Sequence, residues 1–453
     1  MVREKQFYKT FFSMLFLLAG QNVITLLVNL ADNMMLGAYS EVSLSGAAAV
    51  NQVQFVFQMI TASFGNGLAI LGTQYFGKND LPRVRQLASV AMRFAVVTAL
   101  ILFTVMSLIP GRVISIFTAD EAIIAEGVRY VRIIRFTYLF FAVTQLLLAA
   151  LRTAGDARIA LILSLVALGV NCCINYTLIF GRFGAPELGI TGAAVGTLAA
   201  RTVELAVLLW YLARREKKLR LRFRDYLSFD RTLGKDYVKV TLPVFVTDAL
   251  WGFNTAAQNA ILGHMTARAI AANSVASTLF LTVKSSAIGS SQASGFLIGR
   301  SIGEGDEAKV KRYAKTLQLL FLAIGAASSL ILFLIRGPVL SVYHLEPETK
   351  AMAAQFLSIL VVINFTMAYQ MPTNTGIIKA GGATRYCMVL DLISTWVIVL
   401  PLAFVLAFYM KVPPYIVVWC LNADQIFKGI PAFIKCNYGH WIHRLTRADS
   451  PEQ

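Results

Sequence analysis

One carboxylate, Asp32, stands among neutral polar residues in the first apolar segment of the chain. Gln21, Thr25 and Asn29 precede it at intervals that place all four side chains on one face of a helix. An acid inside a membrane helix costs about 2.5–3.5 kcal/mol on insertion scales, so its presence there indicates a function. A carboxylate in this position can bind a hard cation or carry a proton.

Neutral oxygen ligands for such a cation occur in two later apolar segments. Asn171 and Asn175 lie one helical turn apart, and Thr197 lies in a run of small residues. With Asp32 they give one carboxylate and several neutral oxygens, a set suited to Na⁺. The same carboxylate could instead be the proton carrier, so the sequence leaves the coupling ion open.

A second polar stripe follows in the next segment, where Asn51, Gln54, Gln58 and Thr61 repeat the helical spacing. Polar groups in an apolar membrane helix must face protein or water, because lipid offers them no hydrogen bonds. The two stripes therefore predict either the wall of a water-filled cavity or a set of interhelical hydrogen bonds. We expect Gln21, Thr25, Asn29, Asn51, Gln54 and Gln58 to line a cavity.

The second half of the chain carries four charged residues inside apolar segments: Asp248, Lys284, Asp391 and Asp424. A buried lysine needs a partner. We therefore predict that Lys284 lies within salt-bridge reach of Asp248 or Asp391. Such a network could attract a cationic substrate or titrate during transport, or it could be a static neutralising network.

The composition places these residues in a membrane protein. The 453 residues are 57% hydrophobic and 14% charged, whereas soluble domains are about 25% charged. Stretches long enough to span a bilayer recur along the whole chain, with no period-two pattern that would favour a β-barrel. We predict an all-α polytopic protein with twelve transmembrane helices, near residues 11–36, 47–75, 88–110, 129–151, 159–180, 189–212, 238–262, 269–298, 316–335, 351–378, 386–409 and 413–434.

Lysine and arginine residues are concentrated in every second connection, which predicts how the chain is oriented in the membrane. The basic connections follow segments 2, 4, 6, 8 and 10 and include the run from Arg214 to Lys239. Because basic loops stay in the cytoplasm, both termini are expected there, in a plasma-membrane protein. The net charge of +17 is thereby explained, and nucleic-acid binding is not expected. The five cysteines show no metal-ligand or disulfide pattern.

The chain contains an internal repeat. An offset of 226 residues aligns Asn33 with Asn259, Gly37 with Gly263 and Gly77 with Gly303, and an offset of 227 aligns Gly155 with Gly382. Transporters use paired homologous bundles to alternate around a central site. We predict two six-helix lobes, 1–213 and 237–453, joined by a cytoplasmic linker, 214–236.

Several stretches resemble the multidrug and toxic compound extrusion family along nearly the whole chain. They include LADNMMLGAYSEVSLSGAAAVNQV, ALRTAGDARIALILSLVALGVNCCINYTLIFG, GITGAAVGTLAARTVE, LPVFVTDALWG and GIIKAGGATRYCMVLD. The resemblance implies a first-lobe cation site at Asp32, Asn171, Asn175 and Thr197. This sequence departs from the family where Asn175 replaces an aspartate that some members carry, and where FLLAGQN lacks the proline of many first helices.

The expected function is secondary active antiport. The chain would export organic, cationic and amphipathic compounds in exchange for Na⁺ or H⁺ by alternating access. No nucleotide-binding motif or catalytic constellation occurs, so we expect neither an enzyme nor a cofactor beyond the coupling ion. The expected partners are small organic substrates, the coupling cation and the bilayer, and the expected state is a monomer. The alternative functions are a lipid-linked oligosaccharide flippase and a non-transporting receptor. The alternative fold is the major facilitator fold, which also has twelve helices in two halves of six.

Overall fold

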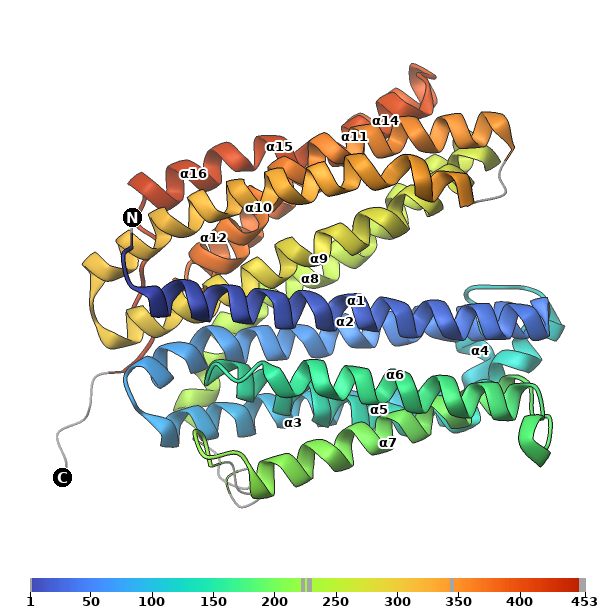
Figure 1. Cartoon of the computed structure of the whole chain (residues 1–453), viewed down its shortest axis with the longest axis horizontal. Helices are drawn as coiled ribbons and strands as arrows, with labels where there is room; N and C mark the ends of the chain where they lie inside the picture. Colours follow the sequence, from blue (N-terminus) through green and yellow to red (C-terminus); the bar gives the residue numbers. More distant parts are fainter. Residues whose placement is uncertain (1, 221–224, 226–229, 343–345, 448–453) are drawn as a thin grey trace. The chain divides into compact units, whose positions relative to one another are not determined.

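The computed structural model describes residues 2–220, 225, 230–342 and 346–447. These residues form helices joined by short turns and no strand, which confirms the all-α prediction (Figure 1). The first half contains α1 (Lys5–Tyr39), α2 (Glu41–Gly77), α3 (Leu81–Leu108), α4 (Pro110–Ile114), α5 (Glu121–Thr153), α6 (Arg158–Ile179), η1 (Arg182–Gly184) and α7 (Ile190–Arg214). The second half contains α8 (Arg231–Met265), α9 (Ala267–Glu304), α10 (Glu307–Val342), α11 (Pro347–Met371), η3 (Pro372–Ile378), α12 (Thr384–Asp391), η4 (Leu392–Val399), α13 (Leu400–Phe404), η5 (Val405–Tyr409), α14 (Pro414–Asn422), α15 (Asp424–Phe427) and α16 (Gly429–Tyr438).

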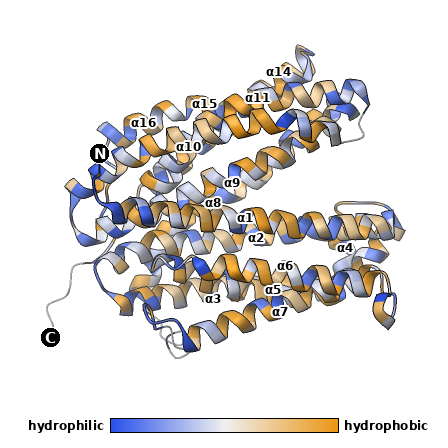
Figure 2. Ribbon diagram, in the orientation of Figure 1, coloured by the Kyte–Doolittle hydropathy of each residue, from blue (hydrophilic) through white to orange (hydrophobic). Residues whose placement is uncertain are grey.

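The helices have the length and the surface of membrane spans. In the described part of the chain, nine helices are long and apolar enough to cross a membrane. Together with α8, α9 and the run α14–α16, they account for the twelve predicted segments. Apolar residues extend along most of each helix (Figure 2), and large ones such as Met34 and Leu108 are exposed, as contact with lipid requires.

The chain divides into two compact units, each of which is described by itself. The N-terminal unit comprises Gly20–Gly72 and Leu81–Thr241, and the C-terminal unit comprises Met1–Ala19, Thr73–Asp80 and Leu242–Gln453. The predicted linker 214–236 lies partly outside the described residues, and the predicted lobe boundaries remain a prediction.

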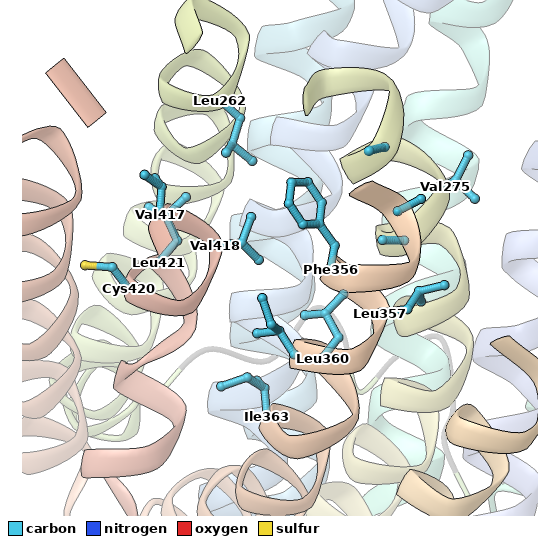
Figure 3. Close-up of a cluster of buried hydrophobic side chains, with 14 of the residues drawn as sticks. Leu262, Val275, Phe356, Leu357, Leu360, Ile363, Val417, Val418, Cys420 and Leu421 are labelled. Carbon is cyan, nitrogen blue, oxygen red and sulfur yellow. The ribbon is translucent and has the colours of Figure 1, made fainter. Parts of the chain in front are cut away.

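Each unit has its own apolar core. In the N-terminal unit, Leu147 and Leu151 of α5 pack with Leu163 of α6 and Leu208 of α7. In the C-terminal unit, α11 supplies the centre of the core, as the close-up in Figure 3 shows. The side chains that surround it there come from α8, α9 and α14 and include Leu262, Val275, Val417, Val418 and Leu421.

The backbone repeats at the offsets that the sequence alignment gave. Asn79 has a φ of 62°, and Gly305, which lies 226 residues later, has a φ of 86°. Gly155 and Gly382, which are 227 residues apart, have φ values of 72° and 96°. Equivalent turns in the two halves thus use the same left-handed conformation, in agreement with the predicted repeat.

A reciprocal helix crossing within the C-terminal unit follows the same repeat. A Cβ at Gly77 would lie 2.1 Å from the carbonyl oxygen of Arg300, and a Cβ at Gly303 would lie 1.9 Å from that of Gln74. The offset of 226 pairs Gln74 with Arg300 and Gly77 with Gly303. The two contacts are therefore equivalent, as at a twofold interface, and glycine lets the backbones touch.

Gly303→Ala is expected to destabilise this crossing, because the new methyl group meets backbone that cannot rotate away. The free energy of unfolding should fall by about 1–3 kcal/mol, the usual cost of overpacking. Thermal unfolding of the purified protein measures it, with Gly252→Ala on α8 as the control, since a Cβ there meets nothing within 4 Å. Equal stability of the two variants would contradict the tight crossing.

Candidate functional site

Asp32 and the predicted neutral ligands come together inside the N-terminal unit. Asn175 donates its Nδ2 to Asp32 Oδ1 at 2.5 Å and to Asn171 Oδ1 at 3.2 Å. Asn171 in turn donates its Nδ2 to Thr197 Oγ1 at 3.4 Å. Side chains from α1, α6 and α7 therefore form one continuous hydrogen-bonded cluster, which we call the Asp32 cluster.

The cluster keeps one strong oxygen ligand unused. Asn175 is fully buried, and its Oδ1 has no hydrogen-bond partner in the structure. An unsatisfied buried carbonyl oxygen costs free energy, so such a group calls for an explanation. Asn175 turns its amide nitrogen toward Asp32 and its oxygen toward Gly196. The carboxylate, amide and hydroxyl oxygens of the cluster are ligand types that Na⁺ accepts.

Small residues on α7 bring α6 close enough to build the cluster. A Cβ at Gly196 would lie 2.0 Å from Asn175 Oδ1, and a Cβ at Gly192 would lie 2.7 Å from the backbone of Leu178. The two glycines are four residues apart and so face α6 together, in the spacing typical of close membrane helix pairs. The small-residue run around Thr197 thus positions Asn175.

Gly196→Ala is expected to displace Asn175 and to lower efflux strongly, because the methyl group would occupy the place of Asn175 Oδ1. Overpacking of this kind costs about 1–3 kcal/mol. Transport and thermal unfolding should be measured together. Gly169→Ala on α6, where a Cβ meets nothing within 4 Å, is the matched control. Full efflux from Gly196→Ala would mean that the position of Asn175 is unimportant.

One further residue lies beside the cluster and was not predicted for it. Arg201 lies one turn beyond Thr197 on α7. Arg201 pairs with Glu204 at 2.7 Å, as its spacing on the helix suggests. The charge of Arg201 is therefore balanced within α7, and Asp32 remains the acid of the cluster.

The polar stripes of α1 and α2 differ from this cluster in having no partners on other helices. Thr25 donates to the carbonyl of Gln21 in its own helix. Asn29 and Asn51 are exposed. Among the described residues, no interhelical hydrogen bond involves Gln21, Thr25, Asn29, Asn51, Gln54 or Gln58. The hydrogen-bond alternative is therefore unsupported for these six side chains, and their role as a cavity wall remains a prediction.

The charges of the C-terminal unit are arranged differently from the prediction. Lys428 Nζ lies 2.7 Å from Asp391 Oδ1 and 2.9 Å from Asp424 Oδ2. Lys428 and Asp424 are buried. Asp391 forms its ion pair with Lys428 and not with Lys284, so the predicted bridge from Lys284 to Asp391 is wrong. The predicted bridge from Lys284 to Asp248 stays a prediction.

An amide chain extends from this triad, which we call the Lys428 triad. Gln425 donates to Asp424 at 2.7 Å, Gln370 donates to Gln425 at 2.6 Å, and Asn374 donates to Gln370 at 3.0 Å. Asn374 lies in the π-helix η3, and Asp391 directly precedes the π-helix η4. Such π-helical turns often occur at functional sites.

Lys428 was missed although the sequence held a signal for it. It follows Asp424 by four residues, the spacing of a helical ion pair. The apolar segments of this half therefore contain three acids and two lysines, rather than three acids and the one lysine, Lys284, of the prediction. The described residues contain no group of three or more His, Cys, Asp or Glu side chains that could hold a metal ion.

Comparison with known proteins gives one family. The MatE family model matches residues 18–177 and 243–405, which is more than half of the chain. A protein of Thermotoga maritima named "Probable multidrug resistance protein NorM" is 28% identical over 94% of this chain and 92% of its own length. A Bacillus subtilis protein named "Probable multidrug resistance protein YoeA" is 25% identical over 79% of this chain and 77% of its own.

Solved structures agree with this fold. The Vibrio cholerae MATE transporter VcmN in its bent form matches with a TM-score of 0.84 and 16% identity, covering 96% of this chain and 97% of that one. A transporter of the MOP superfamily from Pyrococcus furiosus matches with a TM-score of 0.84 and 17% identity, covering 94% of each chain. At this identity the likeness shows the fold alone, and it confirms the prediction of twelve membrane helices in two lobes.

Proposed function

This chain belongs to the MatE family, and from that premise we propose that it is a secondary active antiporter for organic compounds. It would export cationic, amphipathic molecules in exchange for Na⁺ or H⁺. Relatives named multidrug resistance proteins support a multidrug efflux transporter in a membrane. The proposal includes the coupling ion and the substrate class. It also includes a location in the plasma membrane, cytoplasmic termini and a monomeric state.

The observation that carries the antiport mechanism is the Asp32 cluster. It joins Asp32 to the amide nitrogen of Asn175, whose buried oxygen has no hydrogen-bond partner, and it links α1 to α6 and α7. A cation or proton bound at Asp32 would change the contacts among these three helices. Coupling then requires that the ion and the substrate favour different conformations of the protein.

The flippase alternative predicts a strongly basic cavity for an anionic lipid. The membrane-embedded charges of the C-terminal unit instead include Asp391 and Asp424, which share Lys428. These acids match or outnumber the basic groups inside the membrane, which favours an antiporter of small molecules over a flippase of anionic lipids.

The test is export from a host that lacks its own drug pumps. Cells that express the chain should tolerate higher concentrations of cationic dyes and should release a preloaded dye faster than cells with an empty vector. Release should slow when an uncoupler collapses the ion gradients. If expressing cells neither tolerate nor release any organic compound better than control cells, the proposed function is wrong.

A further inference from the structure

The residues that follow α16, Trp441–Arg447, fold back against the C-terminal unit, and we call them the C-terminal strap. Trp441 is buried, and its indole nitrogen donates to the carbonyl of Cys436 at 2.7 Å. His443 donates its backbone N–H to the carbonyl of Gly381 at 2.8 Å. A Cβ at Gly381 would collide with the Trp441 ring, so this glycine makes room for the indole. The first part of the strap is thus held by packing as well as by hydrogen bonds.

The second part of the strap binds Gln74, near the end of α2. Gln74 is fully buried, and its Oε1 accepts the backbone N–H of Leu445 at 2.9 Å. Its Nε2 donates to the carbonyl of His443 at 3.3 Å and to the carbonyl of Ala380 at 3.2 Å. Loss of these bonds would leave buried polar groups without partners, which is costly. The contact is therefore built to stay closed.

Arg447 extends the contact along α2. Its backbone N–H donates to the hydroxyl of Tyr75 at 3.2 Å, and its carbonyl accepts from Lys78 Nζ at 3.0 Å. Gln74 and Lys78 are four residues apart and so lie on the same side of the helix. The strap thus follows one side of the last turns of α2.

The N-terminal unit contains an equivalent arrangement. Lys218, in the segment after α7, donates to the carbonyl of Ala154 at 3.0 Å. The offset of 227 pairs Ala154 with Gly381, whose carbonyl accepts the N–H of His443. In each half, the segment after the last helix therefore lies on the same turn. A segment that recurs in this way is part of the fold.

The strap binds α2 just beyond the point where this helix changes unit. Residues 41–72 of α2 belong to the N-terminal unit, whereas Thr73–Asp80 belong to the C-terminal unit. The helix is continuous across this point. Alternating access moves two bundles relative to each other, so the end of α2 needs an anchor if it is to stay with the C-terminal unit.

We propose that the C-terminal strap fixes the end of α2 to the C-terminal unit and stays attached throughout the transport cycle. Movement of α2 relative to the C-terminal unit is then confined to the part of the helix before Thr73. The anchoring is independent of the proposed function, whereas the requirement for efflux rests on it.

The first test shortens the chain. A protein that ends after His443 keeps Trp441 but loses Leu445 and Arg447, and a protein that ends after Arg447 keeps the whole strap and is the matched control. Hydrogen exchange of the backbone amides of Thr73–Asp80 is measured by mass spectrometry. Exchange should become about tenfold faster in the shorter protein, the scale of one or two lost hydrogen bonds, and stay at the parent rate in the control. Efflux per molecule should fall in the shorter protein alone.

The second test closes the contact covalently. Lys78→Cys and Arg447→Cys are introduced together, because the Lys78 side chain contacts the backbone of Arg447 and Arg447 is exposed. A short bifunctional thiosulfonate, which a reductant removes, joins the two cysteines. The linked protein should keep the efflux rate that it has before linking. The parent treated with the same reagent is the control, since its Cys173 is exposed.

Three results would overturn the inference. Parent-like exchange of Thr73–Asp80 in the protein that ends after His443 would mean that the crossing of Gly77 and Gly303 anchors α2 without the strap. Faster exchange with unchanged efflux would remove the strap from the transport cycle. Loss of efflux on linking, with recovery after reduction, would show that the strap must detach in each cycle. If the parent moves no organic compound, the proposed function fails, while the exchange rates still decide the anchoring.

Discussion

Asp32→Asn is expected to abolish ion-coupled efflux while the protein stays folded and inserted. Asparagine keeps the size of the side chain and can still accept a hydrogen bond from Asn175 Nδ2. It removes the negative charge that a cation needs and the group that would carry a proton. Insertion should be no worse, because a neutral amide costs less in a membrane than a carboxylate. Efflux should fall to the level of membranes without the protein.

The measurement pairs initial efflux rates with the amount of protein in the membrane. Glu204→Gln is the control, since Glu204 is another buried acid of the N-terminal unit but forms an ion pair with Arg201. It should lower the yield of protein rather than efflux per molecule. A loss of efflux per molecule in both variants would point to a general need for buried acids and against a special role for Asp32.

The neutral ligands should give smaller effects. Asn175→Ala removes the unpartnered oxygen and one contact of the acid but keeps the acid, so efflux should fall in part. Thr197→Ala removes a hydroxyl at a distance of 3.4 Å from Asn171 and should be milder. The expected order is Asp32, Asn175 and then Thr197, which follows the strength with which each group interacts with a cation.

Lys428→Met is expected to cause the largest loss of stability in the C-terminal unit. It leaves Asp391 and Asp424 without the cation that both contact, and Asp424 is buried. Removal of one partner of a buried ion pair costs about 3–5 kcal/mol, because an uncompensated charge remains. The protein should unfold at a markedly lower temperature and accumulate poorly in membranes.

A rescue separates charge from packing. The triple variant Lys428→Met, Asp391→Asn, Asp424→Asn contains no unpaired charge and should regain much of the lost stability. Thermal unfolding in detergent is the measurement for both proteins. If the triple variant is no more stable than Lys428→Met, the packing of the lysine chain matters more than its charge, and the triad is not the reason for the loss.

The sequence predicted the elements well for a physical reason. Long apolar segments must become helices in a membrane, because no other open structure satisfies the hydrogen bonds of the backbone N–H and C=O groups there. The spacing of Asn171 and Asn175 places them on one face of a helix. That they meet Asp32 and Thr197 was implied by the resemblance to the multidrug and toxic compound extrusion family. What could not be foreseen is how close α6 lies to α7, which depends on Gly192 and Gly196 and on backbone contacts between them.

The partner of Asp391 was beyond the sequence. The pair of Asp424 and Lys428 follows from their spacing on one helix, but Asp391 lies on another element, α12. Helical spacing reports neighbours on one helix only, so it could not show that Lys428 rather than Lys284 meets Asp391.

The most direct test of ion coupling at Asp32 is uphill transport driven by an ion gradient. Proteoliposomes that contain the parent or Asp32→Asn receive a cationic dye and an imposed gradient of Na⁺ or of H⁺, one at a time. The parent should accumulate the dye against its concentration gradient under one of the two gradients, and Asp32→Asn under neither. Equal uphill accumulation by the parent and by Asp32→Asn would contradict the claim that Asp32 binds the coupling ion.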